Sequence, residues 1–414
     1  MPAVRSDPSF GTQKIRFAVR PRGDRGRPSL GTIVAVEGGP GFASTNFDSA
    51  KSFGAAFGPL LRRRELVLID QRGTGGSQPV LCGGLQRERV AELIAVAECA
   101  NQLGPRAQGF TSAESAADID AVRQALGLRH VILYGDSYGT LLSQAYAVRY
   151  GSNLDGLVLS SAYPADDPFW RTLYPAGVRA LKLQCNRDPS CHGNGAARFR
   201  RVVRLLGADS RRANDLLFFL LENGGTWSPI SYRHLNQADL AFLHGNRRPL
   251  LNLTRPGPPG EGDPSYYSAG MATAVECNDY PVAWDRSAPY AQRVGQLDDA
   301  IAHFPRPQMF APLTVREWMM SPASDLTSCL AWPPPTAPLD PPVPAGATMP
   351  AGLPTLVLAG EFDDITTVAE ARQVAGRFPA SRLFVVPNRG HASELYFPFV
   401  SPASVQIRRF IRAH

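Results

Sequence analysis

Hydrophobic and polar positions follow a repeating pattern in the first 165 residues. Short apolar runs end in glycine or acidic residues at 32–41 (TIVAVEGGPG), 65–77 (ELVLIDQRGTGGS) and 130–137 (HVILYGDS). Between them, residues 112–127 carry apolar side chains at helical spacing, with acids in the first turns. Short buried strands that alternate with helices predict an α/β fold, in which a mostly parallel central sheet has helices on both faces.

The pattern stops near residue 165 and returns near residue 351. Helical segments then alternate with loops rich in glycine and proline, and 332–354 is a proline-rich tract typical of an extended connector. The strand–helix pattern resumes at 355–364 (TLVLAGEFDD), and a last helix is expected from about 401. We therefore predict a core in two parts, 1–164 and 351–414, with a large, mainly helical lid inserted at 165–350.

Composition and charge narrow the class of protein. Of the 414 residues, 44% are hydrophobic and 19% charged, which allows a sizeable core. The net charge of +7 comes almost entirely from arginines that are scattered singly or in short groups. This pattern is typical of a solvated basic surface, so no nucleic-acid partner is expected. No apolar stretch reaches the roughly 18 residues that a membrane-spanning helix needs, so no membrane span is expected.

The six cysteines indicate in which cellular compartment the protein works. An even number favours disulfides and a secreted or cell-envelope protein, while six buried thiols in a cytoplasmic enzyme are the alternative. The opening residues lack the apolar region of a signal peptide, so we expect that any export signal is absent from this chain. Without a CxxC motif or a histidine pair at ligand spacing, no metal site is expected.

The segment GDSYG at 135–139 fits the G-x-S-x-G pattern of a nucleophile elbow. It follows an apolar strand and opens a helix, so the hydroxyl of Ser137 would stand at a helix N-terminus where negative charge is favoured. A purely structural Gly-Ser turn is the alternative interpretation. The context favours Ser137 as a nucleophile.

A serine nucleophile needs a base, and the base needs an orienting acid. Among the seven histidines, His391 alone follows an apolar strand late in the chain. Glu361, Asp363 and Asp364 follow the preceding strand, one helix and one strand earlier, which would bring acid and base to the same sheet edge. The order serine, acid, histidine is that of an α/β-hydrolase.

An oxyanion formed during acyl transfer needs hydrogen-bond donors. The first expected donor is the N–H of Tyr138, directly after the nucleophile. The second would come from the glycine loop at 38–41, where Gly39 is the preferred candidate because Pro40 has no N–H.

Together these motifs resemble the proline iminopeptidase and tripeptidyl aminopeptidase group of α/β-hydrolases. GGPG at 38–41, DQRGTGGS at 70–77, GDSYGT at 135–140, GEFDDIT at 360–366 and RGH at 389–391 match that group's signatures. The resemblance selects Asp363 as the acid. The large insertion, ECND at 276–279 and CLAW at 329–332 resemble the secreted tripeptidyl aminopeptidases more than the proline iminopeptidases.

The resemblance also implies three disulfides, because paired cysteines are bonded in that group. The implied pairs are Cys82–Cys99, Cys185–Cys191 and Cys277–Cys329.

At one position the sequence differs from the signature of this group, and at others the role of the residue has two interpretations. Glu37 stands where the group has histidine, and its carboxylate would oppose the oxyanion unless it turns away or pairs, for example with Arg72. Asp70 and Arg72 are interpreted as structural residues that fix loops. Glu276 and Asp279 could anchor a substrate ammonium, or they could be solvated lid acids.

The resulting hypothesis is a serine aminopeptidase that releases one to three residues from peptide N-termini through Ser137, His391 and Asp363, without a cofactor. An esterase or amidase acting on small acyl substrates is the first alternative, and an inactive hydrolase fold that only binds is the second. The preferred residue before the scissile bond and the oligomeric state stay open.

Overall fold

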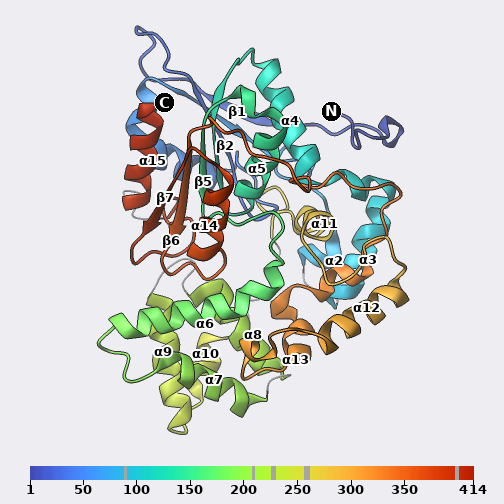
Figure 1. The fold of residues 1–414 in the computed structure, drawn as a ribbon, viewed down its shortest axis with the longest axis vertical. Helices are drawn as coiled ribbons and strands as arrows, with labels where there is room; N and C mark the ends of the chain where they lie inside the picture. Colours follow the sequence, from blue (N-terminus) through green and yellow to red (C-terminus); the bar gives the residue numbers. More distant parts are fainter. Residues whose placement is uncertain (88–90, 208–209, 225–229, 256–261, 397–400) are drawn as a thin grey trace.

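The computed structural model describes residues 1–87, 91–207, 210–224, 230–255, 262–396 and 401–414 (Figure 1). Within these ranges no helix combines the length and the apolar character that crossing a bilayer requires.

The described residues form a seven-stranded sheet in the order β1-β3-β2-β4-β5-β6-β7 (Figure 1). β1 runs antiparallel to β3, and every other neighbouring pair is parallel. The strands are β1 (Phe17–Arg20), β2 (Thr32–Val36), β3 (Glu65–Ile69), β4 (Val131–Asp136), β5 (Leu154–Ser160), β6 (Thr355–Gly360) and β7 (Ser381–Val386). The prediction of a mostly parallel sheet is confirmed.

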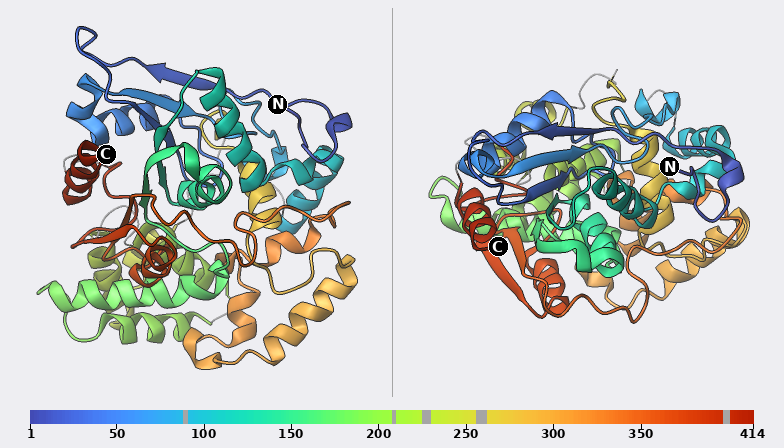
Figure 2. Two further views of the ribbon diagram at one scale, coloured as in Figure 1. Left: turned by 45° about the horizontal axis from the view of Figure 1, so that its top comes forward. Right: turned by 90° about the horizontal axis from the view of Figure 1, so that it is seen from above.

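Helices cover both faces of the sheet (Figure 2). The core helices are α1 (Phe47–Phe57), α2 (Gly83–Gln86), α3 (Glu92–Leu103), α4 (Ser112–Ala125), α5 (Tyr138–Tyr150), α14 (Val368–Arg377) and α15 (Pro402–Ala413). The short 3-10 turns outside the insertion are η1 (Pro8–Phe10), η2 (Gly58–Arg62), η3 (Gly104–Gly109) and η4 (Gly151–Asn153).

Alternate strand residues point to opposite faces and build two apolar clusters. Ile33 and Tyr134 face α1 and α15, whose Phe57 and Ile407 complete one cluster. Their sheet neighbours face α4, α5 and α14 on the other side, for example Leu133. Both faces are buried, which explains why the strands read as continuous apolar runs in the sequence.

Between β5 and β6 the chain forms a helical lid below the sheet (Figures 1 and 2). Its elements are α6 (Phe169–Arg187), α7 (Gly195–Leu206), α8 (Arg211–Phe218), the π-helix η5 (Phe219–Gly224), α9 (Ile230–Leu243), α10 (Arg248–Leu253), α11 (Ala269–Asp279), α12 (Tyr290–Ala302), η6 (Pro307–Phe310), α13 (Val315–Met319), η7 (Pro322–Ser324) and η8 (Thr327–Ala331). The domain boundaries at 164 and 351 stay a prediction. The segment with α2 and α3 packs against α11 and η8 of the lid, which the sequence did not indicate.

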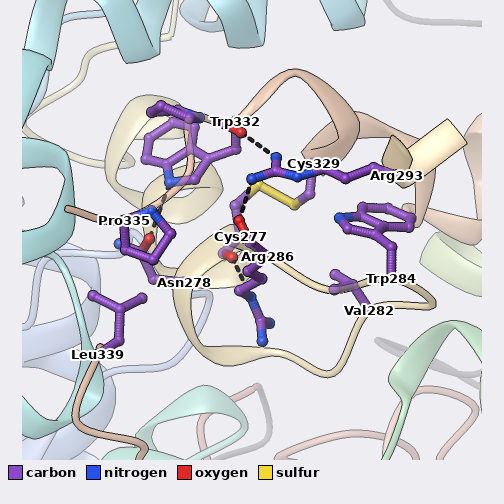
Figure 3. A pocket seen from close by; sticks show the side chains of 11 residues that line it. Cys277, Asn278, Val282, Trp284, Arg286, Arg293, Cys329, Trp332, Pro335 and Leu339 are labelled. Carbon is purple, nitrogen blue, oxygen red and sulfur yellow. Dashed lines mark hydrogen bonds between the residues drawn. A yellow bond between two sulfur atoms is a disulfide. The ribbon is translucent and has the colours of Figure 1, made fainter. Parts of the chain in front are cut away.

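All six cysteines are bonded, in the pairs Cys82–Cys99, Cys185–Cys191 and Cys277–Cys329. The last pair joins α11 to η8 and lies against a small pocket (Figure 3).

Arg286 and the buried Arg293 lie beside the Cys277–Cys329 bond. The guanidinium of Arg293 donates to the carbonyls of Trp332 and Arg286, and Arg286 Nε donates to the carbonyl of Cys277 at 2.8 Å (Figure 3). These bonds link the segment after α11 to the chain after η8.

Candidate active site

Ser137 lies at a sharp turn between β4 and α5. Its φ of 49° and ψ of −123° are unusual for a residue with a side chain. The flanking glycines permit this turn, because a Cβ on Gly135 would lie 2.1 Å from the carbonyl oxygen of Gly139. A Cβ on Gly139 would in turn lie 2.8 Å from the carbonyl oxygen of Val36. The sequence therefore builds a tight elbow that holds Ser137 at the start of a helix.

His391 and Asp363 are brought together by the loops after β7 and β6. The Nδ1 atom of His391 lies 3.0 Å from both carboxylate oxygens of Asp363. The N–H of Thr366 donates to Asp363 Oδ1 at 2.8 Å, and its hydroxyl donates to Oδ2 at 3.0 Å. Asp364 instead accepts a hydrogen bond from the hydroxyl of Tyr232, so the two neighbouring acids have different partners.

The pKa values of this pair follow from its geometry. Burial alone would lower the pKa of His391, but the Asp363 carboxylate outweighs burial and places the pKa above its usual 6.5. Burial would likewise raise the pKa of Asp363, but His391 and the hydrogen bonds of Thr366 lower it. The carboxylate is therefore charged at neutral pH and favours a charged imidazolium next to it.

Ser137 and His391 line one cavity of about 990 Å³ between the sheet edge and the lid. Gly39 and Glu276 line it as well, together with apolar lid residues such as Leu173. The lid thus supplies one wall of the cavity and the sheet loops supply the other.

The two predicted oxyanion donors belong to the loop after β2 and to the start of α5. Gly39 lies on the cavity wall with a φ of 107°, and Tyr138 is the first residue of α5. The glycine loop is tied to the chain before α11, because Ala43 N donates to the carbonyl of Tyr266 and Ser268 N donates to that of Gly41. This pairing docks α11 onto the loop.

Glu276 and Asp279 both belong to α11, but they do not line the same cavity. Glu276 lines the cavity of Ser137, whereas Asp279 is not among the described residues that line it. Asp279 accepts hydrogen bonds of 2.6 Å from both the N–H and the hydroxyl of Ser112, and that hydroxyl lies 3.0 Å from the phenol oxygen of Tyr138. Asp279 therefore braces the side chain of Tyr138 from outside the cavity.

Asp70 and Arg72 hold loops in place. Asp70 accepts hydrogen bonds from Thr45 and from Gly76 N. Arg72 is fully buried and makes a two-pronged ion pair with Asp118. The suggested pairing of Glu37 with Arg72 is wrong, because Asp118 and two backbone carbonyls occupy the guanidinium.

Glu37, which is half-buried, instead belongs to an acidic cluster with the buried Asp136 and Glu394. It accepts a hydrogen bond of 2.8 Å from Ser49, and Tyr134 donates to Glu394 at 2.6 Å. Only Glu37 stood out in the sequence, as a departure from a family pattern. Asp136 lay unremarked inside the nucleophile motif, and no sequence signal pointed to Glu394.

A parallel sheet with a nucleophile elbow after β4 and an acid–histidine pair after β6 and β7 is the arrangement of an α/β-hydrolase. Residues 31–199 match the family model described as the alpha/beta hydrolase fold, and residues 315–401 match the model described as TAP-like protein.

Curated relatives agree with this class. The chain is 24% identical to a tripeptidyl aminopeptidase of Streptomyces coelicolor over 92% of its own length and 74% of the relative's. It is 29% identical to a proline iminopeptidase of Neisseria meningitidis over 34% of this chain and 35% of that one. It is also 24% identical to the serine protease Hip1 of Mycobacterium bovis over 86% of this chain and 74% of the relative.

The chain has the α/β-hydrolase fold, and it is similar to tripeptidyl aminopeptidases and proline iminopeptidases over the shares of each chain given above. It is a serine peptidase of the α/β-hydrolase type.

Proposed function

We propose that this protein is an exopeptidase that releases one to three residues from peptide N-termini by acyl transfer to Ser137. The observation that carries the proposal is that Ser137, His391 and the acid Glu276 line one cavity, with Asp363 bonded behind His391. A nucleophile, an oriented base and a carboxylate for a substrate ammonium are the groups that such an enzyme needs.

The reaction begins when the hydroxyl of Ser137 attacks the scissile carbonyl and His391 takes its proton. Asp363 holds the imidazole by Nδ1 and stabilises the imidazolium. The N–H groups of Gly39 and Tyr138 bind the oxyanion of the tetrahedral intermediate. His391 then protonates the leaving amine, and water repeats the sequence on the acyl-enzyme.

The lid limits what can enter. Its walls exclude water from the reacting groups and restrict the length of the acyl part of the substrate. A carboxylate in the cavity holds the free N-terminus. The sequence suggested Glu276 and Asp279 for this role, and Glu276 is one of several acids that line the cavity. The disulfides fit an oxidising compartment, so we propose that the protein works outside the cytoplasm.

Paired chromogenic amides with free and acetylated N-termini test this proposal. We expect cleavage of the free-amine amides, at least about 10-fold weaker cleavage of the acetylated ones, and a loss of about 10³-fold or more in Ser137→Ala. Equal cleavage of both substrates by the parent enzyme would favour the esterase or amidase alternative. Absence of a fluorophosphonate adduct at Ser137 would favour a binding protein.

A further inference from the structure

Two carboxyl groups lie next to the nucleophile and take no part in the mechanism above. Glu37 follows β2 and Asp136 ends β4, and these strands are parallel neighbours in which Val36 pairs with Gly135. The register therefore places Glu37 beside Asp136. Both residues line the cavity that contains Ser137.

One oxygen of each carboxyl group in this pair lacks a hydrogen-bond donor among the described residues. Asp136 is only 5% exposed. Asp136 Oδ1 and Glu37 Oε2 are both buried, and neither receives a hydrogen bond from an N–H or O–H of the described residues. Two facing carboxyls can bond to each other only if one keeps a proton. Burial raises the pKa of both groups, which favours a pair with one shared proton and one negative charge.

The surroundings of the pair keep that proton in place. Burial raises the pKa of Glu37 to about 7 even though Ser49 stabilises its charged form, and burial also raises the pKa of Asp136. Glu394, which accepts a hydrogen bond from Tyr134, adds negative charge behind both. Buried acceptors without donors are rare in folded proteins, and they point to a ligand that supplies the donors.

Gly38 shows how close the pair is to the reacting serine. A Cβ on Gly38 would lie 2.8 Å from Ser137 Cβ and 3.1 Å from Asp136 Oδ2, so the carboxyl and the nucleophile flank the same glycine. A negative charge at this distance opposes an oxyanion. A cation bound to the pair would remove that opposition.

The cavity favours cations as a whole. Of the described residues that line it, six are acidic, and His391 alone can become positively charged; the acids are Glu37, Asp48, Glu92, Asp136, Glu276 and Asp325. This local charge contrasts with the net charge of +7 of the whole chain. Within the described residues no three potential ligand side chains are arranged to hold a metal ion, which favours an organic cation.

We propose that Glu37 and Asp136 together bind the α-ammonium group of the substrate's first residue, so that the enzyme preferentially releases one residue at a time. In an aminoacyl substrate the ammonium is two bonds from the reacting carbonyl, which suits a carboxyl pair next to Ser137. Each additional residue before the scissile bond would move the ammonium farther from the reacting carbonyl, by up to about 3.3–3.6 Å. The single charge of the pair is neutralised by one ammonium, and no proton has to leave. The inference rests on the proposed exopeptidase function.

Binding measured without turnover tests the inference. L-alaninamide and its uncharged acetylated derivative, N-acetyl-L-alaninamide, are titrated calorimetrically into Ser137→Ala protein. We expect at least 10-fold weaker binding of the acetylated compound, and at least 10-fold weaker binding of L-alaninamide when Glu37→Gln or Asp136→Asn is added. Asp48→Asn, another cavity acid outside the pair, should change the affinity less than twofold. The single variant Glu37→Gln, which keeps Ser137, is labelled with a fluorophosphonate. Labelling shows that this variant is folded.

Several results would overturn the inference. These are unchanged affinity in Glu37→Gln and Asp136→Asn, no binding of L-alaninamide to the parent, or loss of binding only in Glu276→Gln. A higher kcat/KM for Ala-Ala-Ala-4-nitroanilide than for Ala-4-nitroanilide would overturn release of single residues. Failure of the exopeptidase proposal looks different, because the parent enzyme then cleaves free and acetylated amides equally, or cleaves neither, whatever the calorimetry shows.

Discussion

Ser137 combines an uncommon backbone conformation with a place at a helix N-terminus. A non-glycine residue at φ 49° and ψ −123° costs on the order of 1–3 kcal/mol, which the surrounding structure must offset. Here Ser137 N donates to the carbonyl of Ser160 at 2.9 Å, and two glycines leave room for the turn. This conformation places Ser137 at the N-terminus of α5, where the first N–H groups of a helix have no partner within the helix.

In the proposed mechanism, the pKa of His391 sets the acid limb of activity. A general base must be uncharged, and the Asp363 carboxylate keeps the pKa of His391 above 6.5 despite burial. We therefore expect kcat/KM to fall as pH decreases through a midpoint above 6.5.

In Asp363→Asn that midpoint should move to lower pH, because the charge that raises the pKa is gone. The rate at the optimum should fall by up to about 10⁴-fold. The measurement is the pH profile of kcat/KM on a free-amine amide for both proteins. An unchanged midpoint in Asp363→Asn would contradict the assigned role of Asp363.

The carboxyl ends of the strands form the site, and the loops there are held by buried ion pairs. Arg72 follows β3, pairs with Asp118 of α4 and also donates to the carbonyls of Ala3 and Gly109. One guanidinium thus fastens three segments behind the active-site edge. This arrangement is structural, since neither Arg72 nor Asp118 is among the residues that line the cavity.

Arg72→Ala should destabilise the protein by about 3–5 kcal/mol, because it leaves the buried Asp118 without its main partner. Arg5 also contacts Asp118, so a value near the lower end is expected. Urea unfolding measures the loss, and the exposed Arg62→Ala serves as a control that should stay within about 0.5 kcal/mol. A stable Arg72→Ala protein with abolished activity would instead give Arg72 a catalytic role.

Local patterns made much of the sheet, and the loops at its carboxyl edge, predictable. The apolar runs at 32–36, 65–69, 131–136 and 355–360 are strands, and the helix expected over 112–127 is α4. Each of these features depends on neighbouring residues in the chain. The packing of α2 and α3 against the lid was not predictable, because it depends on surfaces that only the folded chain brings together.

The acidic cluster could not be predicted from the sequence either, because its members are far apart in the chain. Glu37, Asp136 and Glu394 come from three distant segments, and only strand register and burial make them neighbours. The pattern of a motif can identify Ser137. It cannot reveal that Asp136, the residue before it, faces a second carboxyl.

Core and lid share one continuous apolar cluster, which extends from Val34 of β2 to Trp318 of α13. We therefore expect the whole chain to unfold in a single transition.

The Cys277–Cys329 bond closes a loop with a sequence separation of 52, and the Cys82–Cys99 bond closes a loop with a sequence separation of 17. Chain entropy then predicts losses of about 4 and about 3 kcal/mol when each pair is replaced by serine. Urea unfolding followed by tryptophan fluorescence and far-UV circular dichroism compares the two double variants with the parent. Two separate transitions in the parent would show that the lid unfolds independently of the sheet, and a larger loss for the Cys82–Cys99 variant would contradict the entropic order.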